Sequence, residues 1–434
     1  TTTQNTLSLH DALPICIIAD DFTGATDIAS FLANNGIATS LFSGVPGEDY
    51  QGGARALVVS LKSRSVPAEE SVTLSLNALH WLQQQRCDRF YFKYCSTFDS
   101  TIKGNIGPVT DALMDALGVA TTIISPALPI NGRTVYQGHL FVEDRLLQES
   151  GMRNHPVNPM DDSDLRRLME RQSRGTCALI NAQILESGEA AVRDEIQTLS
   201  AAGYRYIALD ALNDNHLQIQ GQALHDMKLV TGGSGLAAGL ARRWANATEP
   251  SLPFHVTTSA ATTVVLSGSC SMRTQAQVEK YHQLAPTLAV DVAALLDKRW
   301  TLDEYCGQIV EWLHQQSDAA MAPMVYATTS VAELHNIQQR FGAEPSRLIV
   351  ETLFSLLAKQ LAQQGVSRFI VAGGETSGAV TQALDIRHFA IGAAVSPGVP
   401  WIKADSRPLF LLLKSGNFGD DNFFARAQSA EVCA

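Results

Sequence analysis

Short apolar runs alternate with amphipathic segments along most of this chain, and this alternation restricts the folds that the chain can adopt. Strands that alternate with helices predict a parallel sheet covered by helices on both faces. In the first half of the chain, the expected strands are Ile15–Ala19, Ala56–Leu61, Phe90–Tyr94, Thr121–Ser125, Ala178–Asn181, Tyr206–Leu209 and Lys228–Thr231. The helices expected between them include Asp27–Asn34, Ser71–Gln85, Ile106–Leu117 and Asp161–Arg171.

The alternation stops at residues 245–260, where Pro, Thr and Ser cluster without periodicity, as in a linker. It then restarts with expected strands at Thr262–Ser267, Pro323–Thr328, Arg368–Ala372 and Leu409–Leu413, and with expected helices at Arg273–Tyr281, Ser346–Gln364 and Ser377–Leu384. The sequence therefore predicts an α/β protein with two domains, 15–244 and 261–434. Each domain has a mostly parallel sheet flanked by helices, and a ligand cleft lies between the domains. The polar, Thr-rich residues 1–14 are interpreted as a non-native or disordered leader.

The composition excludes several classes of protein. A hydrophobic content of 45% is enough to form a core, and a net charge of −11 disfavours nucleic acid as a partner. No apolar run reaches the ~18 residues that span a membrane. The seven cysteines form no C-x-x-C pair, which argues against a zinc site or a disulfide framework and for a reducing, cytoplasmic location. A homodimer is compatible with this composition.

Two adjacent aspartates follow the first strand in the motif A-D-D-F-T-G-A-T-D. Asp20 and Asp21 therefore lie at the carboxyl end of a strand, where open α/β sheets bind their ligands. Neighbouring carboxylates repel each other, so a fold retains them mainly where a cation, a sugar hydroxyl or a proton transfer uses them. In the alternative interpretation, both residues only cap the following helix.

Polar and cationic residues also follow three further strands of the first half. The candidate substrate-binding residues are Arg64 after the second strand, Asp99 and Ser100 after the third, and Asn131 and Arg133 after the fourth. Lys103, which also follows the third strand, is a candidate catalytic residue together with Asp20 and Asp21. Arginine suits the bidentate recognition of a carboxylate, and lysine acts as a point charge. These positions predict a site for a small polar anion.

Glycine-rich turns between strands and helices mark the second half. The first contains Ser267, Ser269 and Ser271, the second contains Gly373, Gly374, Glu375 and Thr376, and Gly416 follows the last strand. Small residues let backbone N–H groups approach an anion, and a helix N-terminus adds a positive dipole. The chain has no Gly-Lys pair and hence no Walker A loop. The turns predict a polyphosphate site that is formed mostly by backbone amides.

A third glycine motif resembles a dinucleotide fingerprint. Gly233, Gly235 and Ala238 match G-x-G-x-x-A after an apolar run, but the linker occupies the place of the acidic strand end that the fingerprint requires. Close packing of a helix on a strand, or a wall of the cleft, explains this motif better than nicotinamide binding does.

Taken together, these motifs resemble those of the four-carbon acid sugar kinases, two-domain bacterial enzymes with an acid-sugar-binding and a nucleotide-binding domain. The resemblance runs from about Ile15 to Ala427 and includes A-D-D-F-T-G-A-T-D, D-S-T-x-K-G-N-I-G, T-G-G-S-G-L-A, S-G-S-C-S, A-G-G-E-T-S-G-A-V and K-S-G-N-F-G. The stretches N-G-R-T-V-Y-Q-G-H-L-F and M-R-N-H-P-V-N-P-M most resemble the branch that acts on 3-oxo-tetronates.

The resemblance implies ATP-dependent phosphorylation of the terminal hydroxyl, on C4, of a 3-oxo-tetronate to give its 4-phosphate. ATP would bind at Ser267–Ser271, Gly373–Thr376 and Gly416, and Mg²⁺ would bridge its phosphates with few protein ligands. The acid sugar would bind at Asp20, Asp21, Arg64, Asp99 and Lys103. Asp21 or Asp20 would accept the hydroxyl proton, and Arg64 and Lys103 would hold the substrate carboxylate or the transferred charge.

Other functions stay open at this point. A kinase for D-threonate or D-erythronate would carry out the same chemistry. A nucleotide-dependent dehydrogenase would form no ADP, and a non-catalytic sugar-acid sensor would bind its ligand and leave ATP intact. We also expect Asp21 to lie in a different domain from the glycine turns, so that its substitution leaves the affinity for ATP nearly unchanged.

Overall fold

The computed structural model describes residues 14–429 apart from 48–49, 51, 156–157 and 245–261. Its contacts group the chain into two compact units. Unit 1 contains Thr1–Asp20 and Phe31–Ser251, and unit 2 contains Asp21–Ser30 and Leu252–Ala434. The segment Asp21–Ser30 thus groups with the second half of the chain, whereas the sequence prediction placed it in the first domain. Nearly all of the expected leader and the whole expected linker lie outside the described residues.

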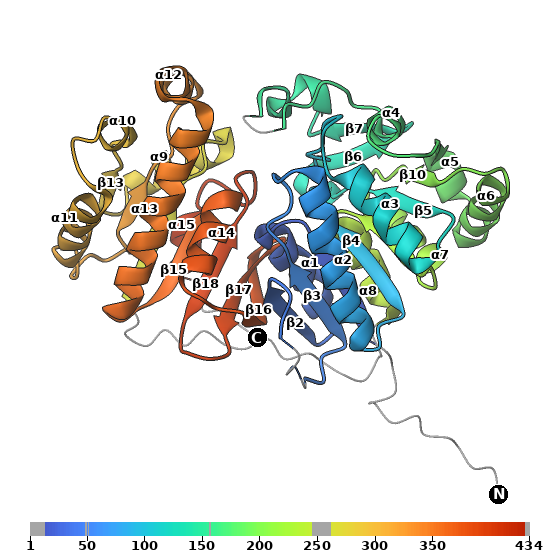
Figure 1. Cartoon of the computed structure of the whole chain (residues 1–434), viewed down its shortest axis with the longest axis horizontal. Helices are drawn as coiled ribbons and strands as arrows, with labels where there is room; N and C mark the ends of the chain where they lie inside the picture. The colour runs from blue at the N-terminus through green and yellow to red at the C-terminus, as the bar shows by residue number, and fades with distance from the viewer. Residues whose placement is uncertain (1–13, 48–49, 51, 156–157, 245–261, 430–434) are drawn as a thin grey trace, which may run out of the picture. The chain divides into compact units, whose positions relative to one another are not determined.

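Unit 1 is built on a parallel sheet with the strand order β2-β3-β1-β4-β11-β5-β10-β9 (Figure 1). The strands are β1 Ile15–Ala19, β2 Thr39–Ser43, β3 Ala56–Ser60, β4 Arg89–Lys93, β5 Thr122–Ser125, β9 Cys177–Ile180, β10 Tyr206–Leu209 and β11 Leu229–Gly232. Every residue of β1 is buried, as expected for an apolar strand between two neighbours. Ala19 pairs with Ser60 of β3 and with Lys93 of β4, so these three strands end side by side.

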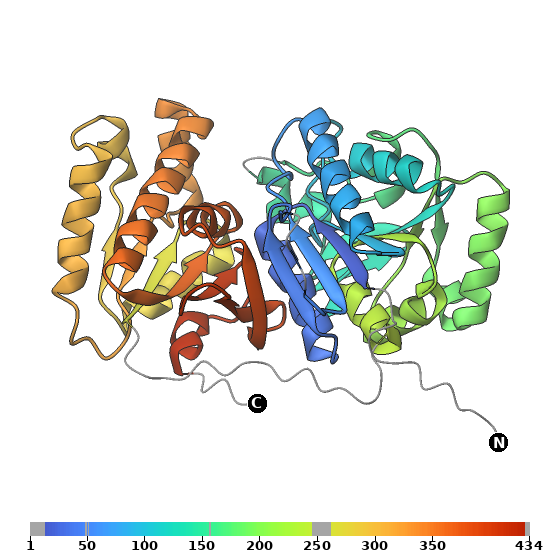
Figure 2. The same cartoon turned by 60° about the horizontal axis from the view of Figure 1, so that its bottom comes forward.

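The helices of unit 1 cover both faces of its sheet. They are α1 Phe22–Asn34, whose first part groups with unit 2, α2 Ala68–Gln84, α3 Ile106–Leu117, α4 Leu165–Glu170, α5 Ala182–Glu186, α6 Glu189–Ala201, α7 Asp214–Leu224 and α8 Ser234–Trp244. Helices α2 and α3 pack together on one face, and α7 and α8 pack together on the other (Figures 1 and 2). This arrangement follows from right-handed crossovers between parallel strands.

Close packing explains the glycines that resemble a dinucleotide fingerprint. A Cβ on Gly233 would lie 2.5 Å from the carbonyl oxygen of Pro126, and one on Gly235 would overlap the carbonyl oxygen of Ala127. Both glycines therefore let the start of α8 approach the chain that follows β5. The prediction of close helix–strand packing at this motif is confirmed.

A small antiparallel sheet, which the sequence prediction missed, branches from unit 1. Its strands are β6 Arg133–Tyr136, β7 His139–Val142 and β8 Arg145–Leu146, and short 3-10 helices flank it at Pro129–Asn131, Leu147–Glu149 and Gly151–Asn154. The segment that holds Asn131 and Arg133 was expected to be a loop at the edge of the main sheet. Strands this short, separated by tight turns, give too few residues for a clear alternating pattern.

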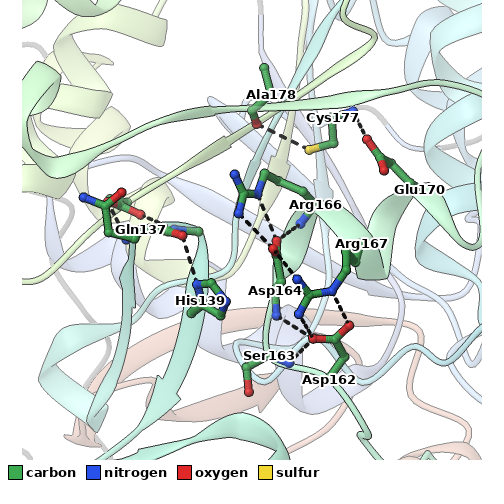
Figure 3. A network of polar contacts seen from close by, with 12 residues as sticks. Gln137, His139, Asp162, Ser163, Asp164, Arg166, Arg167, Glu170, Cys177 and Ala178 are labelled. Atoms are coloured by element: carbon green, nitrogen blue, oxygen red, sulfur yellow. Dashed lines mark hydrogen bonds and ion pairs between the residues drawn. The ribbon is translucent and has the colours of Figure 1, made fainter.

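A network of ion pairs between two buried aspartates and two more exposed arginines supports this antiparallel sheet (Figure 3). The Asp164 carboxylate accepts hydrogen bonds from Arg166 and Arg167, and Arg167 also donates to Asp162 through two nitrogens. The hydrogen bonds from Arg167 lower the pKa of Asp162 to about 2, against the opposing effect of burial. The network therefore stays ionised at neutral pH and holds α4 against β7, whose residue Leu140 donates its N–H to the Ser163 carbonyl.

Unit 2 is built on a mixed sheet with the strand order β13-β14-β12-β15-β18-β17-β16. The strands are β12 Thr262–Ser267, β13 Thr287–Ala289, β14 Met324–Tyr326, β15 Val366–Ala372, β16 His388–Ser396, β17 Val399–Ala404 and β18 Phe410–Lys414. From β13 to β18 the neighbours are parallel, whereas β17 is antiparallel to both β18 and β16. The prediction missed this hairpin because its strands contain glycine and proline, and Pro400 pairs with Ala394 at a register shift.

The helices of unit 2 are α9 Met272–His282, α10 Val292–Leu296, α11 Leu302–His314, α12 Val331–Phe341, α13 Ala343–Gln363, α14 Gly374–Ala383 and α15 Phe423–Ser429. Helices α13 and α14 pack together on one face of the sheet, and α9 and α15 pack together on the other (Figures 1 and 2). Among the described residues, no helix is both long enough and apolar enough to cross a membrane.

The cysteines differ from the sequence prediction at one pair. Cys16 and Cys87 form a single disulfide, with their Cα atoms 6.0 Å apart, whereas the sequence analysis argued only against a disulfide framework. Cys16 lies on β1 opposite Phe90 of the neighbouring strand β4, and Cys87 lies just before that strand. The strand order brings the two thiols together, and the local sequence around each gives no sign of it.

Candidate active site

The first strand leads to Asp20, whose carboxylate binds Arg64 from the loop after β3. Nε and Nη2 of Arg64 donate to Oδ2 and Oδ1 of Asp20, both at 2.8 Å. The side chain of Asp20 is 8% exposed, and its carbonyl accepts the backbone N–H groups of Ser63 and Arg64. The structure thus brings two predicted residues together. Both carboxylate oxygens of Asp20 are engaged by the guanidinium, in the bidentate geometry that arginine favours.

Asn105 supports the loop that carries Arg64, and the sequence prediction missed it. Its Nδ2 lies 2.6 Å from the carbonyl oxygen of Ser63, 3.1 Å from that of Arg64 and 3.0 Å from that of Val66. Asn105 is 7% exposed and precedes the first residue of α3. The side chain therefore joins the loop after β3 to the start of α3. The only sequence signal was the asparagine of K-G-N-I-G at the expected helix start.

The loop after β4 contains three predicted residues, which differ in their surroundings. Asp99 accepts a hydrogen bond from Thr97, and it lies close enough to Cys95 to act on the thiol. Burial, and after it the charge of Asp99, raise the pKa of the Cys95 thiol to about 12, with Arg64 acting in the opposite direction. The charges of Asp99 and Arg64 thus both act on one buried thiol.

Ser100 and Lys103 lie in the same loop. The Ser100 hydroxyl is buried, donates to Oε1 of Gln172 at 2.6 Å and accepts the N–H of Ile106. These bonds anchor the loop to α3 and to the chain after α4, so the structure gives Ser100 a structural role. The side chain of Lys103 is exposed.

Asn131 and Arg133 lie at the start of the small antiparallel sheet: Asn131 ends the 3-10 helix Pro129–Asn131, and Arg133 is the first residue of β6. The Nη1 of Arg133 donates to the carbonyl of Asn131 across the turn that precedes β6, and Arg133 is 6% exposed. The sequence prediction was right that the two residues follow β5. It did not predict that the chain after β5 forms a small sheet of its own.

The glycine turns of unit 2 meet at one edge of its sheet, because β12, β15 and β18 are neighbours. Gly268 donates its N–H to the carbonyl of Ala372, and Gly373 donates to that of Lys414. A Cβ on Gly268 would overlap the hydroxyl oxygen of Thr376, and one on Gly373 would lie 3.1 Å from the backbone nitrogen of Ser269. The turns after β12 and β15 are therefore in direct contact, which requires glycine at these positions.

Gly416 joins the same cluster from the turn after β18. A Cβ on Gly416 would lie 2.5 Å from Oγ of Ser269, and its carbonyl accepts a hydrogen bond from Oγ of Ser271 at 2.7 Å. Gly373 has a φ of +121°, a conformation that side chains other than glycine rarely adopt. The structure therefore brings together the three turns that the sequence predicted as one polyphosphate site.

Two helices begin at these turns. Ser271 caps α9 by accepting the N–H of Thr274, and α14 begins at Gly374. Glu375 lies in the first turn of α14, and the buried Thr376 faces Gly268. Ser267 is fully buried, and its hydroxyl shares a hydrogen bond with the hydroxyl of Thr328, in the loop that follows β14. Both helix N-termini present a positive dipole, which favours an anion at the helix start.

Asp21 lies beside the glycine turn at Gly374. Its Oδ1 accepts the N–H of Gly24 and its Oδ2 accepts the hydroxyl of Thr23, so Asp21 does cap α1, which begins at Phe22. A Cβ on Gly374 would lie 3.6 Å from Oδ2 of Asp21. The sequence analysis expected Asp21 in a different domain from the glycine turns, whereas the contacts of the structure group it with unit 2, which contains this turn. Adjacent aspartates thus have different partners: Asp20 binds Arg64, and Asp21 faces the start of α14.

Comparison with known proteins indicates that the two halves of the chain bind different ligands. Residues 15–240 match a family model described as a sugar-binding N-terminal domain, and residues 264–424 match one described as a nucleotide-binding C-terminal domain. These matches, with the glycine turns of unit 2, define the class: an α/β sugar kinase with separate sugar-binding and nucleotide-binding parts.

Full-length relatives narrow this class. The 3-oxo-tetronate kinase of Pectobacterium atrosepticum is 56% identical over 95% of this chain and 98% of its own length. That of Escherichia coli K12 is 57% identical over 89% of this chain and 99% of its own length. A crystal structure from Salmonella typhimurium LT2, provisionally described as a tRNA synthase, has a TM-score of 0.84 and 56% identity, and covers 96% of this chain and 99% of its own.

The chain belongs to the four-carbon acid sugar kinase family, and its full-length similarity is to the 3-oxo-tetronate kinases of that family. It is a carbohydrate phosphotransferase with a nucleotide-binding domain, as the motifs predicted.

Proposed function

We propose that this chain transfers the terminal phosphoryl group of ATP to the C4 hydroxyl of a 3-oxo-tetronate and so forms the 4-phosphate. One observation carries the proposal: the Asp21 carboxylate lies beside Gly374, at the start of α14 in the nucleotide-binding unit. A carboxylate at that position suits a group that accepts the hydroxyl proton during phosphoryl transfer. The preceding residue, Asp20, holds Arg64 in the sugar-binding unit.

The two aspartates have different roles in this proposal. Asp21 is the proton acceptor, and Asp20 positions Arg64, because both oxygens of Asp20 already accept guanidinium hydrogen bonds. Arg64 and the exposed Lys103 supply positive charge for the substrate carboxylate or for the transferred phosphoryl group. Asp99, Asn131 and Arg133 stay candidate substrate-binding residues, and Ser100 acts through the loop that it anchors.

The nucleotide phosphates bind at the cluster of glycine turns. Backbone N–H groups of the turns and the starts of α9 and α14 supply the positive potential. The set proposed for ATP is Ser267, Ser269, Ser271, Gly373, Gly374, Glu375, Thr376 and Gly416. Of these, the buried Ser267 supports the turn after β12, since its hydroxyl is hydrogen-bonded to that of Thr328.

The residues at this cluster fit Mg²⁺ as a partner of the phosphates. The hydroxyl oxygens of this cluster are hard ligands of the kind that Mg²⁺ takes, and this ion keeps several waters. Among the described residues, no group of three or more His, Cys, Asp and Glu side chains gathers as a metal site. The chain would therefore supply few ligands, and the phosphates would supply others. When bound, Mg²⁺ would neutralise the charge of the phosphates.

A panel of four-carbon acids and their 3-oxo forms, screened for ADP release, tests this function. We expect rapid, substrate-dependent ADP release with a 3-oxo-tetronate and a 4-phosphate product identified by mass spectrometry. Preferred turnover of D-threonate or D-erythronate would replace the proposed substrate with that of the related kinases. Substrate oxidation without ADP would indicate a dehydrogenase, and binding with intact ATP would indicate a sensor.

The Salmonella structure is provisionally described as a tRNA synthase. The composition of this chain does not support a function that requires RNA binding. Its net charge is −11, whereas a protein that binds RNA needs a basic face for the phosphate backbone. A homodimer and a cytoplasmic location stay predictions from the sequence.

Replacement of Asn105 by Asp tests the support of Arg64. The change replaces a donor with a negative charge that faces carbonyl oxygens, so we expect the loop after β3 to shift and Arg64 to lose its orientation. The KM for the acid sugar should rise by roughly tenfold or more, since lost buried hydrogen bonds weaken binding by this order. The KM for ATP should stay nearly constant.

Asn215→Asp is the matched control, because Asn215 is exposed on α7. It should leave both KM values unchanged. An unaltered KM for the acid sugar in a folded Asn105→Asp protein would show that this loop does not orient the substrate.

A further inference from the structure

Lys414, the last residue of β18, is fully buried, which is rare for a lysine. Its Nζ donates hydrogen bonds to the hydroxyl of Thr274 and to the carbonyls of Ser415 and Gly416, each at 3.0 Å. All three of these acceptors are neutral oxygens. Burying an ammonium among neutral groups costs free energy of folding. We therefore expect a fold to keep a buried lysine where the side chain has a function.

The ammonium of Lys414 stabilises the turn after β18, which contains Ser415 and Gly416. The Gly416 carbonyl also accepts hydrogen bonds from the hydroxyls of Ser271 and Thr274, both at 2.7 Å, from the start of α9. Several donors therefore converge on this one carbonyl and hold the turn after β18 against the turn after β12.

The geometry of the peptide bond relates these hydrogen bonds to the nucleotide site. In a trans peptide, the C=O and N–H groups point in opposite directions. Because the carbonyls of Ser415 and Gly416 point toward the ammonium, the N–H groups of Gly416 and Asn417, which complete the same two peptides, point away from it. Two successive N–H groups that face the same way form an anion-binding concavity.

We propose that Lys414 is a positioning residue of the nucleotide site, which aims the N–H groups of Gly416 and Asn417 at the nucleotide phosphates without touching the nucleotide. The inference rests on the proposed function, because it assigns the phosphates to this cluster of turns. It adds a buried cation to a site whose visible components are backbone amides and hydroxyls.

The protonation of Lys414 gives a readout that a purely structural role would not give. Burial, and after it the charge of Arg273 on α9, which is paired with Asp421, lower the pKa of Lys414 to about 7. A neutral amine has only two N–H groups for three acceptors, so the turn loosens as the proton leaves. Since the protonated form holds the turn, nucleotide affinity should fall as pH rises through about 7.

The test is calorimetric titration of the full chain with ADP in excess Mg²⁺. The titrations are made between about pH 6 and about pH 9, a range chosen to span the pKa of Lys414 of about 7. We expect Lys414→Met to weaken ADP binding by about tenfold at pH 6 and to abolish the pH dependence seen in the parent, since a lost charged hydrogen-bond network is worth this order. Lys403→Met is the matched control: Lys403 is exposed on β17 of the same unit and should leave binding unchanged.

A second variant keeps the test decisive if Lys414→Met fails to fold. Thr274→Val removes one acceptor of the ammonium and one donor to Gly416 but keeps the lysine, and it should weaken ADP binding severalfold. Parent-like ADP affinity in either folded variant, with the pH dependence retained, would overturn the inference. A parent that binds ADP but phosphorylates no four-carbon acid would overturn the proposed substrate and leave this inference standing. A parent that does not bind ADP would overturn both.

Discussion

Replacing Asp21 by Asn is expected to lower kcat by about two to four orders of magnitude, the contribution typical of a general base in proton transfer. The amide cannot accept the hydroxyl proton. It keeps an oxygen that can accept the N–H of Gly24, and asparagine is a good helix cap, so α1 should stay intact. The measurement is ADP release at saturating ATP and acid sugar, with thermal unfolding as the check on folding.

The affinity for ADP should not fall in this variant. Asp21 lies beside Gly374, so its replacement removes a negative charge next to the expected phosphates. A decrease in kcat without weaker nucleotide binding would separate a catalytic role from a binding role. If turnover stays within a few-fold of the parent, Asp21 is not the proton acceptor, and the capping of α1 becomes its main role.

Gly374→Val is expected to be the most damaging change in the nucleotide-binding unit that leaves the fold intact. A Cβ at Gly374 lies at ordinary contact distance, 3.6 Å from Oδ2 of Asp21 and 3.7 Å from Oγ1 of Thr23, so the backbone tolerates a side chain. The two methyl groups of valine would then occupy the space between the start of α14 and Asp21. We expect the KM for ATP to rise about a hundredfold, because the phosphates could no longer approach the backbone N–H groups.

The control for this prediction is Gly307→Val on α11. Gly307 is exposed, and a Cβ there would have no neighbour within 4 Å, so steady-state kinetics should stay at parent values. Measured KM values for ATP that are equal in the Gly374 variant, the Gly307 variant and the parent would remove this turn from the nucleotide site.

The sequence predicted the elements that carry the site because their signals are local. The apolar run of β1, the following aspartates and the glycine turns after β12 and β15 each occupy a short segment. The prediction that two glycine turns and Gly416 form one site needed only the parallel order of their strands, and the structure places the turns in contact. Strands β16 and β17, which contain glycine or proline, and the four-residue strand β6 gave no such local signal.

The partners of individual side chains could not be predicted in the same way. Asn105 contacts carbonyls about forty residues away, and Lys414 donates to Thr274, 140 residues away. Neither asparagine nor lysine is unusual in its own sequence context. Cys16 and Cys87 likewise meet only because β1 and β4 are neighbours in the sheet.

By itself, the sequence predicted an α/β protein with glycine turns for a polyphosphate, because periodicity and turn chemistry are properties of consecutive residues, and the resemblance of its motifs to a known family indicated the sugar kinase activity. Only the tertiary structure decided that Asp20 binds Arg64 while Asp21 faces Gly374, and that Lys414 is buried beneath Gly416. These contacts depend on strand order and on which direction each side chain leaves the backbone. Both are fixed by packing between segments far apart in the chain.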